Sequence, residues 1–356
     1  MSKTALCLKT PKAYGEKVIT TANKLGIIDK ELEIQRDNNH IYVPLTRNPK
    51  PDELEKLKEH SPTIEVSTYT FPERHKQPKT IREVLEDRMP PHLLACLPSA
   101  LDFVGDIAIV EIPPELEAYN TDIGNAILQV HKNVRTVLAK SGAIKGEYRL
   151  REFNIIAGQN KTETIHKEHG CQFHVDLAKA YFSPRLSNEH MRVASVVKEG
   201  ETVVDMFAGI GPFAVLIAKT HVNVKVYAID INPAAIELLK KNIRLNRVNQ
   251  KVYPILGDAR QIIKQQLRGK ADRIIMNLPE KAIEFIDAAC ETLKPEGGII
   301  HFYGFARGMD GLETLKTRFT KEVEKHGRTV KAILFSRFVR ETAPYEWQAV
   351  IDAEII

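Results

Sequence analysis

The fold class is decided by the stretch Val203-Val204-Asp205-Met206-Phe207-Ala208-Gly209-Ile210-Gly211-Pro212-Phe213. An apolar run ends in an acid, a short turn with two glycines follows, and a proline introduces a second apolar run. This order predicts a β-strand, a tight turn and the start of a helix. The turn at 208–211 carries few side chains, so its backbone can approach a ligand closely.

Around this stretch, residues 186–356 alternate between strand and helix patterns, which is typical of a parallel sheet covered by helices. We expect strands near 202–206, 224–229, 252–256, 273–277, 297–303, 331–338 and 347–354. We expect helices near 187–197, 212–219, 233–245, 259–267, 280–293 and 310–326. The predicted fold class is therefore α/β, with a Rossmann-fold domain in this region.

Acids also stand at the ends of the next two strands. Asp230 lies 19 residues after Gly211, where Rossmann-like sites hold ribose hydroxyls with a carboxylate. Asp258 follows the third strand, where a carboxylate can accept a hydrogen bond from an adenine amino group. Open α/β sheets bind ligands at the carboxyl ends of their strands, so these acids should share one site. The candidate cofactor-binding residues are Asp205, Phe207, Gly209, Gly211, Asp230, Ile231, Asp258, Ala259 and Asn277.

Two features favour S-adenosylmethionine over a dinucleotide such as NAD. Ala214 occupies the place of the third glycine in the GxGxxG pattern. Asp205 suits a cationic ligand better than a pyrophosphate, and S-adenosylmethionine carries a sulfonium and an ammonium group but no phosphate. We therefore expect S-adenosylmethionine as the cofactor.

A fourth strand ends in Asn277-Leu278-Pro279. The proline restricts the turn, so that the Asn277 amide and nearby backbone carbonyls can face a flat polar ring. The sequence matches the fourth-strand motif of class I methyltransferases that modify nitrogen atoms of planar bases. The alternative is a turn that merely ends the strand.

The polar segment 71–79 contains two prolines and is predicted to be a linker. It separates a small N-terminal α/β domain, residues 1–70, from a middle α/β domain, residues 80–185. The composition of the N-terminal domain leaves open whether it is a docking or stabilising appendage or an RNA-binding module. Its expected elements are helices at 12–25 and 52–60 and strands at 33–36, 40–45 and 64–69. In the middle domain we expect a helix at 80–88, a strand at 103–112, an amphipathic helix at 121–140 and a β-meander at 149–157, 162–169 and 171–177.

Composition excludes several classes of function. No apolar run approaches the roughly 18 residues that span a bilayer, and the N-terminal apolar run is too short for a signal peptide, so a cytoplasmic location is expected. The four cysteines form no CxxC pair, and we expect no metal site. The net charge of +5 is mild, so RNA binding would depend on local clusters. The basic clusters, which either contact phosphate or form a solvated face, are Lys240, Lys241, Arg244, Arg247 and Lys251, and Arg337 and Arg340.

With these residues in place, the chain resembles the archaeal–eukaryotic family of tRNA (guanine-N1)-methyltransferases, which methylate guanosine 37, on the 3′ side of the anticodon. The resemblance spans essentially the whole chain, and its diagnostic stretches are 146–152, 180–189, 205–213 and 277–279. It implies a Rossmann-fold class I methyltransferase domain beside the middle and N-terminal domains. It also implies S-adenosylmethionine as cofactor and tRNA as partner, bound at its anticodon loop and, by residues 1–70, at its outer corner. We expect a monomer.

The resemblance implies four catalytic residues, Arg149, Tyr181, Glu189 and Asn277. Arg149 corresponds to the arginine that stabilises charge on guanine O6, and Glu189 to the general base for the N1 proton. Burial that raises the pKa of Glu189 toward neutrality would suit this task. One departure is His190, which follows the glutamate where the family usually has arginine.

Other functions stay open. Related enzymes of the wybutosine pathway transfer the aminocarboxypropyl arm of the same cofactor or methylate a wyosine intermediate at position 37. Glu189 favours methylation at N1, because that reaction needs a base. A non-catalytic RNA-binding protein that retains the cofactor fold is a further alternative, which the intact set of Arg149, Glu189 and Asn277 disfavours.

Overall fold

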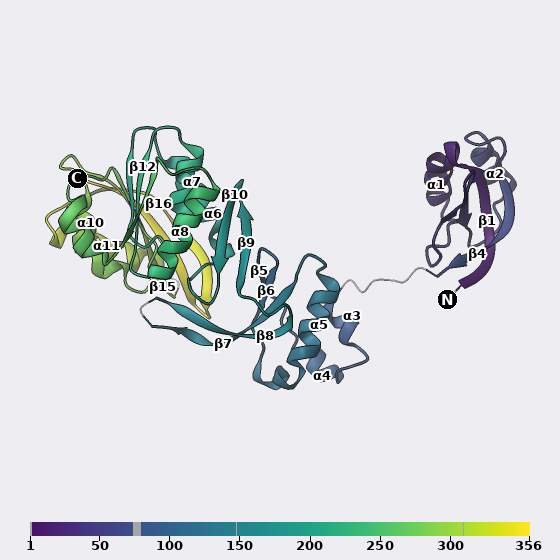
Figure 1. Cartoon of the computed structure of the whole chain (residues 1–356), viewed down its shortest axis with the longest axis horizontal. Coiled ribbons are helices and arrows are strands. Elements are labelled where there is room, and N and C mark those ends of the chain that lie inside the picture. Colours follow the sequence, from purple (N-terminus) through teal and green to yellow (C-terminus); the bar gives the residue numbers. More distant parts are fainter. Residues whose placement is uncertain (1, 74–79, 147, 309) are drawn as a thin grey trace. The chain divides into compact units, whose positions relative to one another are not determined.

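The computed structural model describes residues 2–73, 80–146, 148–308 and 310–356 (Figure 1). The chain divides into two compact units, Met1–Lys79 and Thr80–Ile356, and each is described by itself. Most of the predicted linker, residues 74–79, lies outside the described residues, as does Glu147 of the first diagnostic stretch.

The first unit is an antiparallel sheet in the order β2-β3-β1-β4 with helices packed on it. Its elements are β1 (Ser2–Pro11), a 3-10 turn (Lys12–Tyr14), α1 (Gly15–Lys24), β2 (Gln35–Arg36), β3 (His40–Pro44), α2 (Pro51–Lys58) and β4 (Glu65–Pro72). Leu8, Val18 and Leu57 are fully buried in its main core. The central strand β1 was not predicted, because its apolar residues are confined to the short run Ala5–Leu8.

The predicted linker begins too early. Phe71 and Pro72 belong to β4, where Phe71 pairs with Lys3 of β1. Phe71 is fully buried and packs with Cys7 and Leu32. Proline is tolerated on an edge strand such as β4, so Pro72 does not mark the end of the folded unit.

Replacing Phe71 by alanine is expected to lower the free energy of unfolding of the first unit by about 3–5 kcal/mol, because the change leaves a cavity. The single tryptophan, Trp347, lies in the second unit, so its fluorescence reports on that unit alone. The stacked rings of Tyr42 and Tyr69, 4.1 Å apart, are expected to contribute to the near-UV circular dichroism beside aromatic residues of the second unit such as the stacked Tyr227 and Tyr253. A part of the circular dichroism change should therefore move to lower temperature, while the Trp347 fluorescence transition stays in place. A joint shift would mean that the units unfold together.

The second unit begins with a sheet in the order β5-β6-β7-β8, in which only β6 and β7 are parallel. Its elements are α3 (Ile81–Leu85), α4 (Pro91–Leu94), β5 (Leu101–Val104), β6 (Ile107–Val110), a 3-10 helix (Pro114–Tyr119), α5 (Asn120–Val130), β7 (Thr136–Lys145) and β8 (Leu150–Gly158). Strands β9 (Glu163–Glu168) and β10 (Cys171–Asp176) form a separate antiparallel ladder. The predicted meander is therefore wrong, because β8 pairs with β7 and not with β9.

Two further predictions for this region are wrong. The single strand at 103–112 is instead the hairpin β5–β6, because Gly105 turns the chain with a φ of 55°. The helix at 121–140 ends at Val130, and 136–145 is a strand. Val137, Leu138 and Ala139 are buried consecutively, as expected of a strand covered on both faces. Over so short a run, that pattern cannot be told from a buried helix by periodicity.

The rest of the second unit is a seven-stranded sheet in the order β13-β12-β11-β14-β15-β17-β16. Its strands are β11 (Thr202–Asp205), β12 (Lys225–Asp230), β13 (Val252–Leu256), β14 (Arg273–Met276), β15 (Gly298–Arg307), β16 (Val330–Ala343) and β17 (Glu346–Ile355). Its helices are a 3-10 turn (Pro184–Leu186), α6 (Ser187–Val196), α7 (Pro212–Thr220), α8 (Pro233–Leu245), α9 (Ala259–Ile262) with a π-helical continuation (Ile263–Leu267), a 3-10 turn (Ala282–Phe285), α10 (Ile286–Thr292) and α11 (Gly311–Lys325). The predicted Rossmann-fold domain is confirmed, although β17 runs antiparallel to both β15 and β16.

Helices cover both faces of this sheet (Figure 1). Helices α6, α7 and α8 share one core with Val203, and α9, α10 and α11 share another with Val204. The chain leaves β11 toward β12 on one side and later returns to β14 on the other. Such a switch point is where open α/β sheets bind ligands. The turn at 208–211 and Asn277 follow the two strands that flank it.

Candidate active site

A hollow of about 1160 Å³ opens at the carboxyl ends of β11, β12, β13 and β14. The predicted site residues that line it are Arg149, Tyr181, Phe207, Gly209, Asp230, Ile231, Asp258, Ala259 and Asn277. Asp205, Gly211 and Glu189 are buried and do not line it. The fold therefore brings most of the predicted residues together, although they are widely separated in the sequence.

The glycine turn has a backbone that other residues adopt only with strain. Gly209 has a φ of 56° and Gly211 a φ of 88°. A Cβ atom on Gly211 would lie only 2.2 Å from Cδ1 of Leu239. The Gly209 N–H donates to Oδ2 of Asp230 at 2.7 Å, which fastens the turn to the end of β12. The Gly209 side of the turn is thereby presented to the hollow.

Asp205 is fully buried at the end of β11, and burial raises the pKa of its carboxyl to about 7. The Phe207 N–H, 3.4 Å from Oδ1, opposes this rise, whereas the nearby charge of Asp230 adds to it. Burial also raises the pKa of Asp230. The Oδ2 atom of Asp205 has no hydrogen-bond partner among the described residues. A fully buried acid with an unpartnered oxygen, beside the half-buried Asp230, fits a ligand that brings positive charge, as S-adenosylmethionine does.

Replacing Asp205 by asparagine is expected to flatten the pH dependence of stability. An acid whose pKa is higher in the folded chain holds its proton more tightly there. Stability therefore falls as the pH rises from about 4, the value in an unfolded chain, toward about 7. Thermal unfolding followed by Trp347 fluorescence should show a larger loss between about pH 5 and about pH 8 in the wild type than in the variant. Equal losses would assign the titration to another group.

Asp258 and Asp230 also have local structural partners. Asp258 caps the N-terminus of α9, with Oδ1 accepting from the Gln261 N–H at 3.1 Å. Asp230 Oδ1 accepts from the Asn232 N–H at 2.8 Å. Each nevertheless lines the hollow, so capping and ligand contact are compatible in these carboxylates.

A chain of hydrogen bonds joins Asn277 to Tyr181. Asn277 Oδ1 accepts from Gln348 at 3.1 Å, and Gln348 Oε1 accepts from Nε of Arg340 at 2.9 Å. Arg340 also donates to the hydroxyl oxygens of Tyr181 and Ser183, at 3.0 and 3.1 Å. Arg340 and Gln348 line the hollow but were not predicted as pocket residues. They lie on β16 and β17, which pair with each other far along the chain from the glycine turn. The local sequence around that turn does not predict this pairing.

Arg149 has an unusual backbone and an unsatisfied side chain. Its φ of 55° is left-handed, which is uncommon for a residue with a Cβ atom. Its Nη2 lies 3.3 Å from Oε1 of Glu280, and its guanidinium lies 5.3 Å from the ring centre of Tyr181. Its Nε is buried with no hydrogen-bond partner among the described residues. A strained residue with a spare donor, placed in a hollow, is suited to bind an acceptor atom of a ligand.

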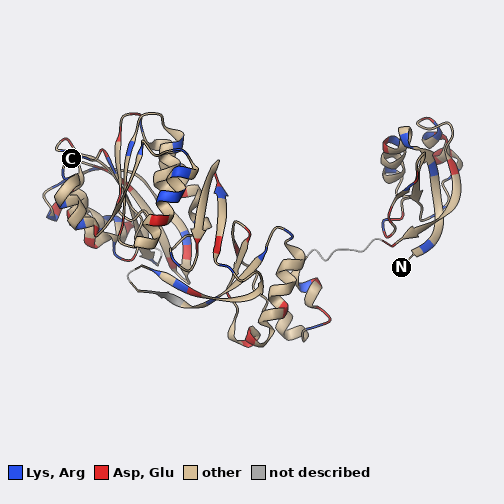
Figure 2. Cartoon of the chain, viewed as in Figure 1, with Lys and Arg blue, Asp and Glu red and all other residues tan. Residues whose placement is uncertain are grey.

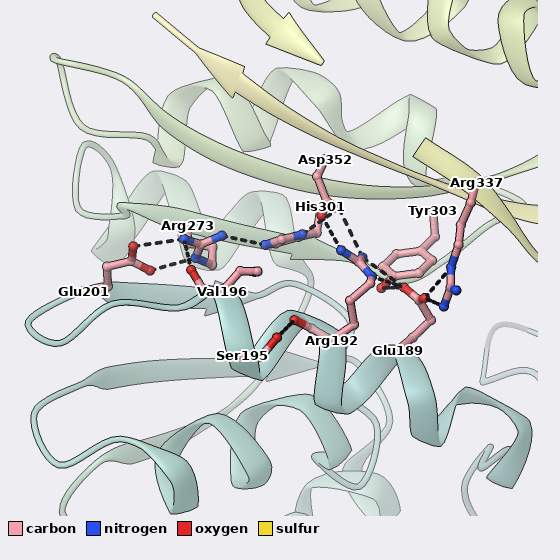
Figure 3. A network of polar contacts seen from close by, with 10 residues as sticks. All are labelled: Glu189, Arg192, Ser195, Val196, Glu201, Arg273, His301, Tyr303, Arg337 and Asp352. Carbon is pink, nitrogen blue, oxygen red and sulfur yellow. Dashed lines mark hydrogen bonds and ion pairs between the residues drawn. The ribbon is translucent and has the colours of Figure 1, made fainter. Parts of the chain in front are cut away.

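Glu189 is only 1% exposed, and cations surround its carboxylate (Figure 3). Arg192 lies 2.9 Å from Oε2, the Tyr303 hydroxyl donates to Oε2 at 2.9 Å, and Arg337 binds Oε1. Burial alone would raise the pKa of Glu189, but the hydrogen bonds and charge of Arg192, with the hydrogen bonds of Arg337 and Tyr303, hold it below its ordinary value. The expectation that burial raises the pKa of Glu189 toward neutrality is therefore wrong, because these contacts lower it. Arg337 belongs to this cluster. The sequence predicted Arg337 only as part of a basic patch with Arg340, and did not predict its contact with Glu189.

Comparison with known proteins identifies the family. Residues 164–331 match the model of the TRM5/TYW2 methyltransferase domain, 81–162 that of the TYW2 N-terminal domain and 7–53 that of the tRNA methyltransferase 5 N-terminal domain. The chain is 42% identical to the tRNA (guanine(37)-N(1))-methyltransferase Trm5b of Pyrococcus abyssi (strain GE5 / Orsay), over 98% of this chain and 99% of that protein. The chain belongs to the Trm5 family of tRNA methyltransferases.

Two other similarities show how far along the chain the likeness extends. A solved complex of aTrm5 and tRNALeu matches with a TM-score of 0.80 at 35% identity, covering 99% of this chain and 100% of that one. A tRNA(Phe) (4-demethylwyosine(37)-C(7)) aminocarboxypropyltransferase of Methanocaldococcus jannaschii is 36% identical, over 70% of this chain and 96% of that protein. Similarity to Trm5 proteins thus extends over the first unit, whereas the aminocarboxypropyltransferase matches a shorter part of the chain.

His190 stands where the Trm5 resemblance predicts arginine, and it is buried. Its Nδ1 lies 2.7 Å from Oε1 of Glu168, and its ring meets that of Phe213 edge-on. Burial alone would raise the pKa of Glu168, but hydrogen bonds from His166 and His190 hold it at about 2. The hydrogen bond of His190 therefore goes to Glu168, and the Glu189 carboxylate receives its positive charge from Arg192 and Arg337 instead.

Blue segments on α8 in Figure 2 mark its Lys and Arg residues, and the predicted basic cluster continues past the helix to Arg247 and Lys251. Two of its lysines have partners within the protein. Lys240 pairs with Glu237 at 2.7 Å, and Lys251 donates to the carbonyl oxygen of His221 at 2.6 Å. Among the described residues, no three His, Cys, Asp or Glu side chains gather where they could hold a metal ion. In the same part of the chain, no helix is long and apolar enough to cross a membrane.

Proposed function

We propose that this protein transfers a methyl group from S-adenosylmethionine to N1 of guanosine 37 of tRNA. The observation that carries the proposal is the arrangement within one hollow. Asp230 at the end of β12 lines its cofactor side, with Asp205 buried at the end of β11, and Asn277 and Arg149 border the same space. The full-length similarity to Trm5b of Pyrococcus abyssi supports this substrate and this position.

S-adenosylmethionine is the methyl donor of this family and supplies the methyl group from its sulfonium. The Gly209 turn, Asp230 and Ile231 would hold its nucleoside, with Asp258 and Ala259 beside the adenine. Asp205, beneath the turn, would stabilise the positive charge of S-adenosylmethionine. The Oδ2 atom of Asp205 has no hydrogen-bond partner among the described residues. Gly211 permits the turn itself.

The acceptor base would lie against Asn277 and Pro279, with Arg149 at its O6 edge. Loss of the N1 proton places negative charge on O6, and a preorganised guanidinium stabilises such charge. The buried Nε of Arg149, which has no partner among the described residues, supplies a free donor for this task. Tyr181 packs against the Arg149 guanidinium and would keep it in place.

Glu189 would accept the N1 proton. Guanine N1 is a poor nucleophile until that proton leaves, so a positioned carboxylate accelerates the reaction. The base must also leave its stack to enter the hollow, at a cost of a few kcal/mol. Arrival of the base therefore has to coincide with a rearrangement around Glu189, because the carboxylate does not line the hollow.

The proposed partner is tRNA, contacted at its anticodon loop by the second unit and at its outer corner by the first. The match of residues 7–53 to the tRNA methyltransferase 5 N-terminal domain supports a tRNA-binding role for the first unit. The solved complex of aTrm5 and tRNALeu supports tRNA binding by the chain as a whole. We place the protein in the cytoplasm as a monomer.

The proposal is tested by incubating the protein with S-adenosylmethionine and an unmodified tRNA transcript that carries guanosine 37. Digestion to nucleosides should yield 1-methylguanosine. A matched transcript with adenosine 37 should yield none. Absence of 1-methylguanosine from the first transcript, or equal amounts from both, would contradict the proposal.

A further inference from the structure

The two oxygens of the Glu189 carboxylate have different partners (Figure 3). Oε2 accepts from Nε of Arg192 at 3.0 Å and from the Tyr303 hydroxyl at 2.9 Å. Oε1 accepts from the guanidinium of Arg337, including a 3.2 Å bond from its Nε. The hydrogen bonds of each oxygen therefore come from separate elements, α6 and β15 for Oε2 and β16 for Oε1.

The Oε2 side is anchored by a buried polar chain. Arg192 also binds the carboxylate of Asp352, which lies 2.7 Å from Nδ1 of His301. Nε2 of His301 lies 2.8 Å from Arg273, and Arg273 makes a two-pronged pair with Glu201.

This chain also defines the protonation of His301. Because an arginine cannot accept a proton, Nε2 of His301 must be the acceptor, and the proton of a neutral ring then lies on Nδ1, which is 2.7 Å from Oδ1 of Asp352 but in a geometry that makes no hydrogen bond. Moving Arg192 would leave a buried carboxylate, Asp352, short of its partner, which is costly.

The Oε1 side lacks such an anchor. The Arg337 side chain is 45% exposed, whereas that of Arg192 is 17% exposed. Its other described contact is with the ring of Phe335, at 5.7 Å. Arg340, on the same strand, lines the hollow in which the base would bind. When Arg337 leaves, the buried Glu189 carboxylate keeps Arg192 and Tyr303, whereas departure of Arg192 would take a partner from both Glu189 and Asp352. Arg337 is therefore the more readily displaced of the two arginines.

We propose that Arg337 is a displaceable counter-ion of Glu189, which an RNA phosphate draws away so that Oε1 becomes free to accept the proton of the base. This inference rests on the proposed function, because it assigns Glu189 as the proton acceptor. Arg192 and Tyr303 stay on Oε2 and keep the carboxylate oriented. Arg337 is thus a positioning residue whose removal from Glu189 couples RNA binding to the activity of the base.

The coupling has a definite sign in pH profiles. The charged and titratable groups facing Glu189 are Arg192, Tyr303 and Arg337, with Asp352 behind Arg192. Loss of Arg337 removes a positive charge, so the pKa of Glu189 rises. The acid limb of kcat/KM reports the free enzyme, and that of kcat reports the enzyme with bound RNA. In the wild type the kcat limb should lie at higher pH than the kcat/KM limb.

The test compares Arg337→Met with Lys331→Met, a control on the same strand whose lysine pairs with Glu354. Methylation of the guanosine 37 transcript is measured across pH, and RNA binding is measured across salt. Arg337→Met should move the kcat/KM limb up to meet the kcat limb, and it should reduce the salt dependence of RNA binding by about one phosphate contact. Arg337→Lys should restore the wild-type order of the limbs, and Lys331→Met should change neither quantity.

The outcomes separate this inference from the function on which it rests. A wild type that makes no 1-methylguanosine sinks the proposed function. An active wild type with an unmoved kcat/KM limb in Arg337→Met overturns the inference. Inactivity of Arg337→Met at every pH, with cofactor binding intact, also overturns it, because Arg337 would then be needed in the chemical step. If Trp347 fluorescence shows that Arg337→Met does not fold, Arg337→Gln is used in its place. The position of its kcat/KM acid limb then tests the inference in the same way.

Discussion

Replacing Glu189 by glutamine should lower the methylation rate of guanosine 37 by about 10²–10⁴-fold, the range that general acid–base catalysis contributes. Glutamine has nearly the same shape and can still accept from Arg192 and Tyr303, but it cannot take the N1 proton. Cofactor affinity should stay within about twofold, because Glu189 does not line the hollow. Single-turnover rates and calorimetric titration with S-adenosylmethionine measure the two quantities.

Glu201 offers a matched control for the Glu189 variant. It is also a carboxylate bound by an arginine, Arg273, at the far end of the same buried chain. Glu201→Gln should lower the melting temperature without a comparable loss of rate. If Glu189→Gln lost cofactor affinity and rate in equal measure, or if Glu201→Gln lost as much rate, Glu189 would have a structural role only.

Replacing Arg149 by methionine should lower kcat by about 10²–10³-fold, the loss that follows removal of one donor from a developing oxyanion. The buried Nε of Arg149 has no partner among the described residues, so its natural acceptor is the ligand. Methionine keeps a Cβ atom at the left-handed backbone position, so the variant does not relax the turn. KM for tRNA should change little, because the charge on O6 develops in the transition state. Rapid-quench measurement of the methylation step checks this.

Two further variants control for charge and folding. Arg149→Lys retains the positive charge but loses the planar fork, so it should recover only a small part of the rate. Arg135 is exposed just before β7 in the same unit, and Arg135→Met should leave the rate unchanged. A full rescue by lysine would mean that charge alone suffices. A raised KM at unchanged kcat would assign Arg149 to RNA binding.

The cofactor side of the site could be predicted from sequence because its signals are local. The glycine turn, Asp205 and Asp230 each follow a strand with a clear apolar run, and parallel strands bring their carboxyl ends together. The predicted helices and strands from 186 onward agree with the structure for the same reason. The structure adds the depth of burial of Asp205, which a linear pattern does not contain.

The acceptor side could be predicted only in part, because its partners meet through distant pairing. The contact of Arg192 with Glu189 could have been predicted, because residues three apart on a helix lie on the same face. Tyr303 and Arg337 lie 114 and 148 residues away along the chain. Their approach depends on the register of β15, β16 and β17, which no local pattern determines. This is why the pKa of Glu189 was predicted in the wrong direction.

The middle region shows the same limit in the fold itself. Val134, Val137 and Leu138 fit a helical face, yet β7 forms because Val137 and Leu138 pair with Ala108 and Ile109 of the parallel strand β6. Strand pairing across this distance overrides a short periodic signal. At Gly105 a single glycine divides one apolar run into two strands.

S-adenosylmethionine labelled either in its methyl group or in its carboxyl group distinguishes transfer of the methyl group to guanosine 37 from transfer of the aminocarboxypropyl arm. With the same guanosine 37 transcript, we expect the methyl label to enter the tRNA and to be recovered in 1-methylguanosine, while the carboxyl label stays in solution. Recovery of the carboxyl label in the tRNA, without the methyl label, would contradict methyl transfer.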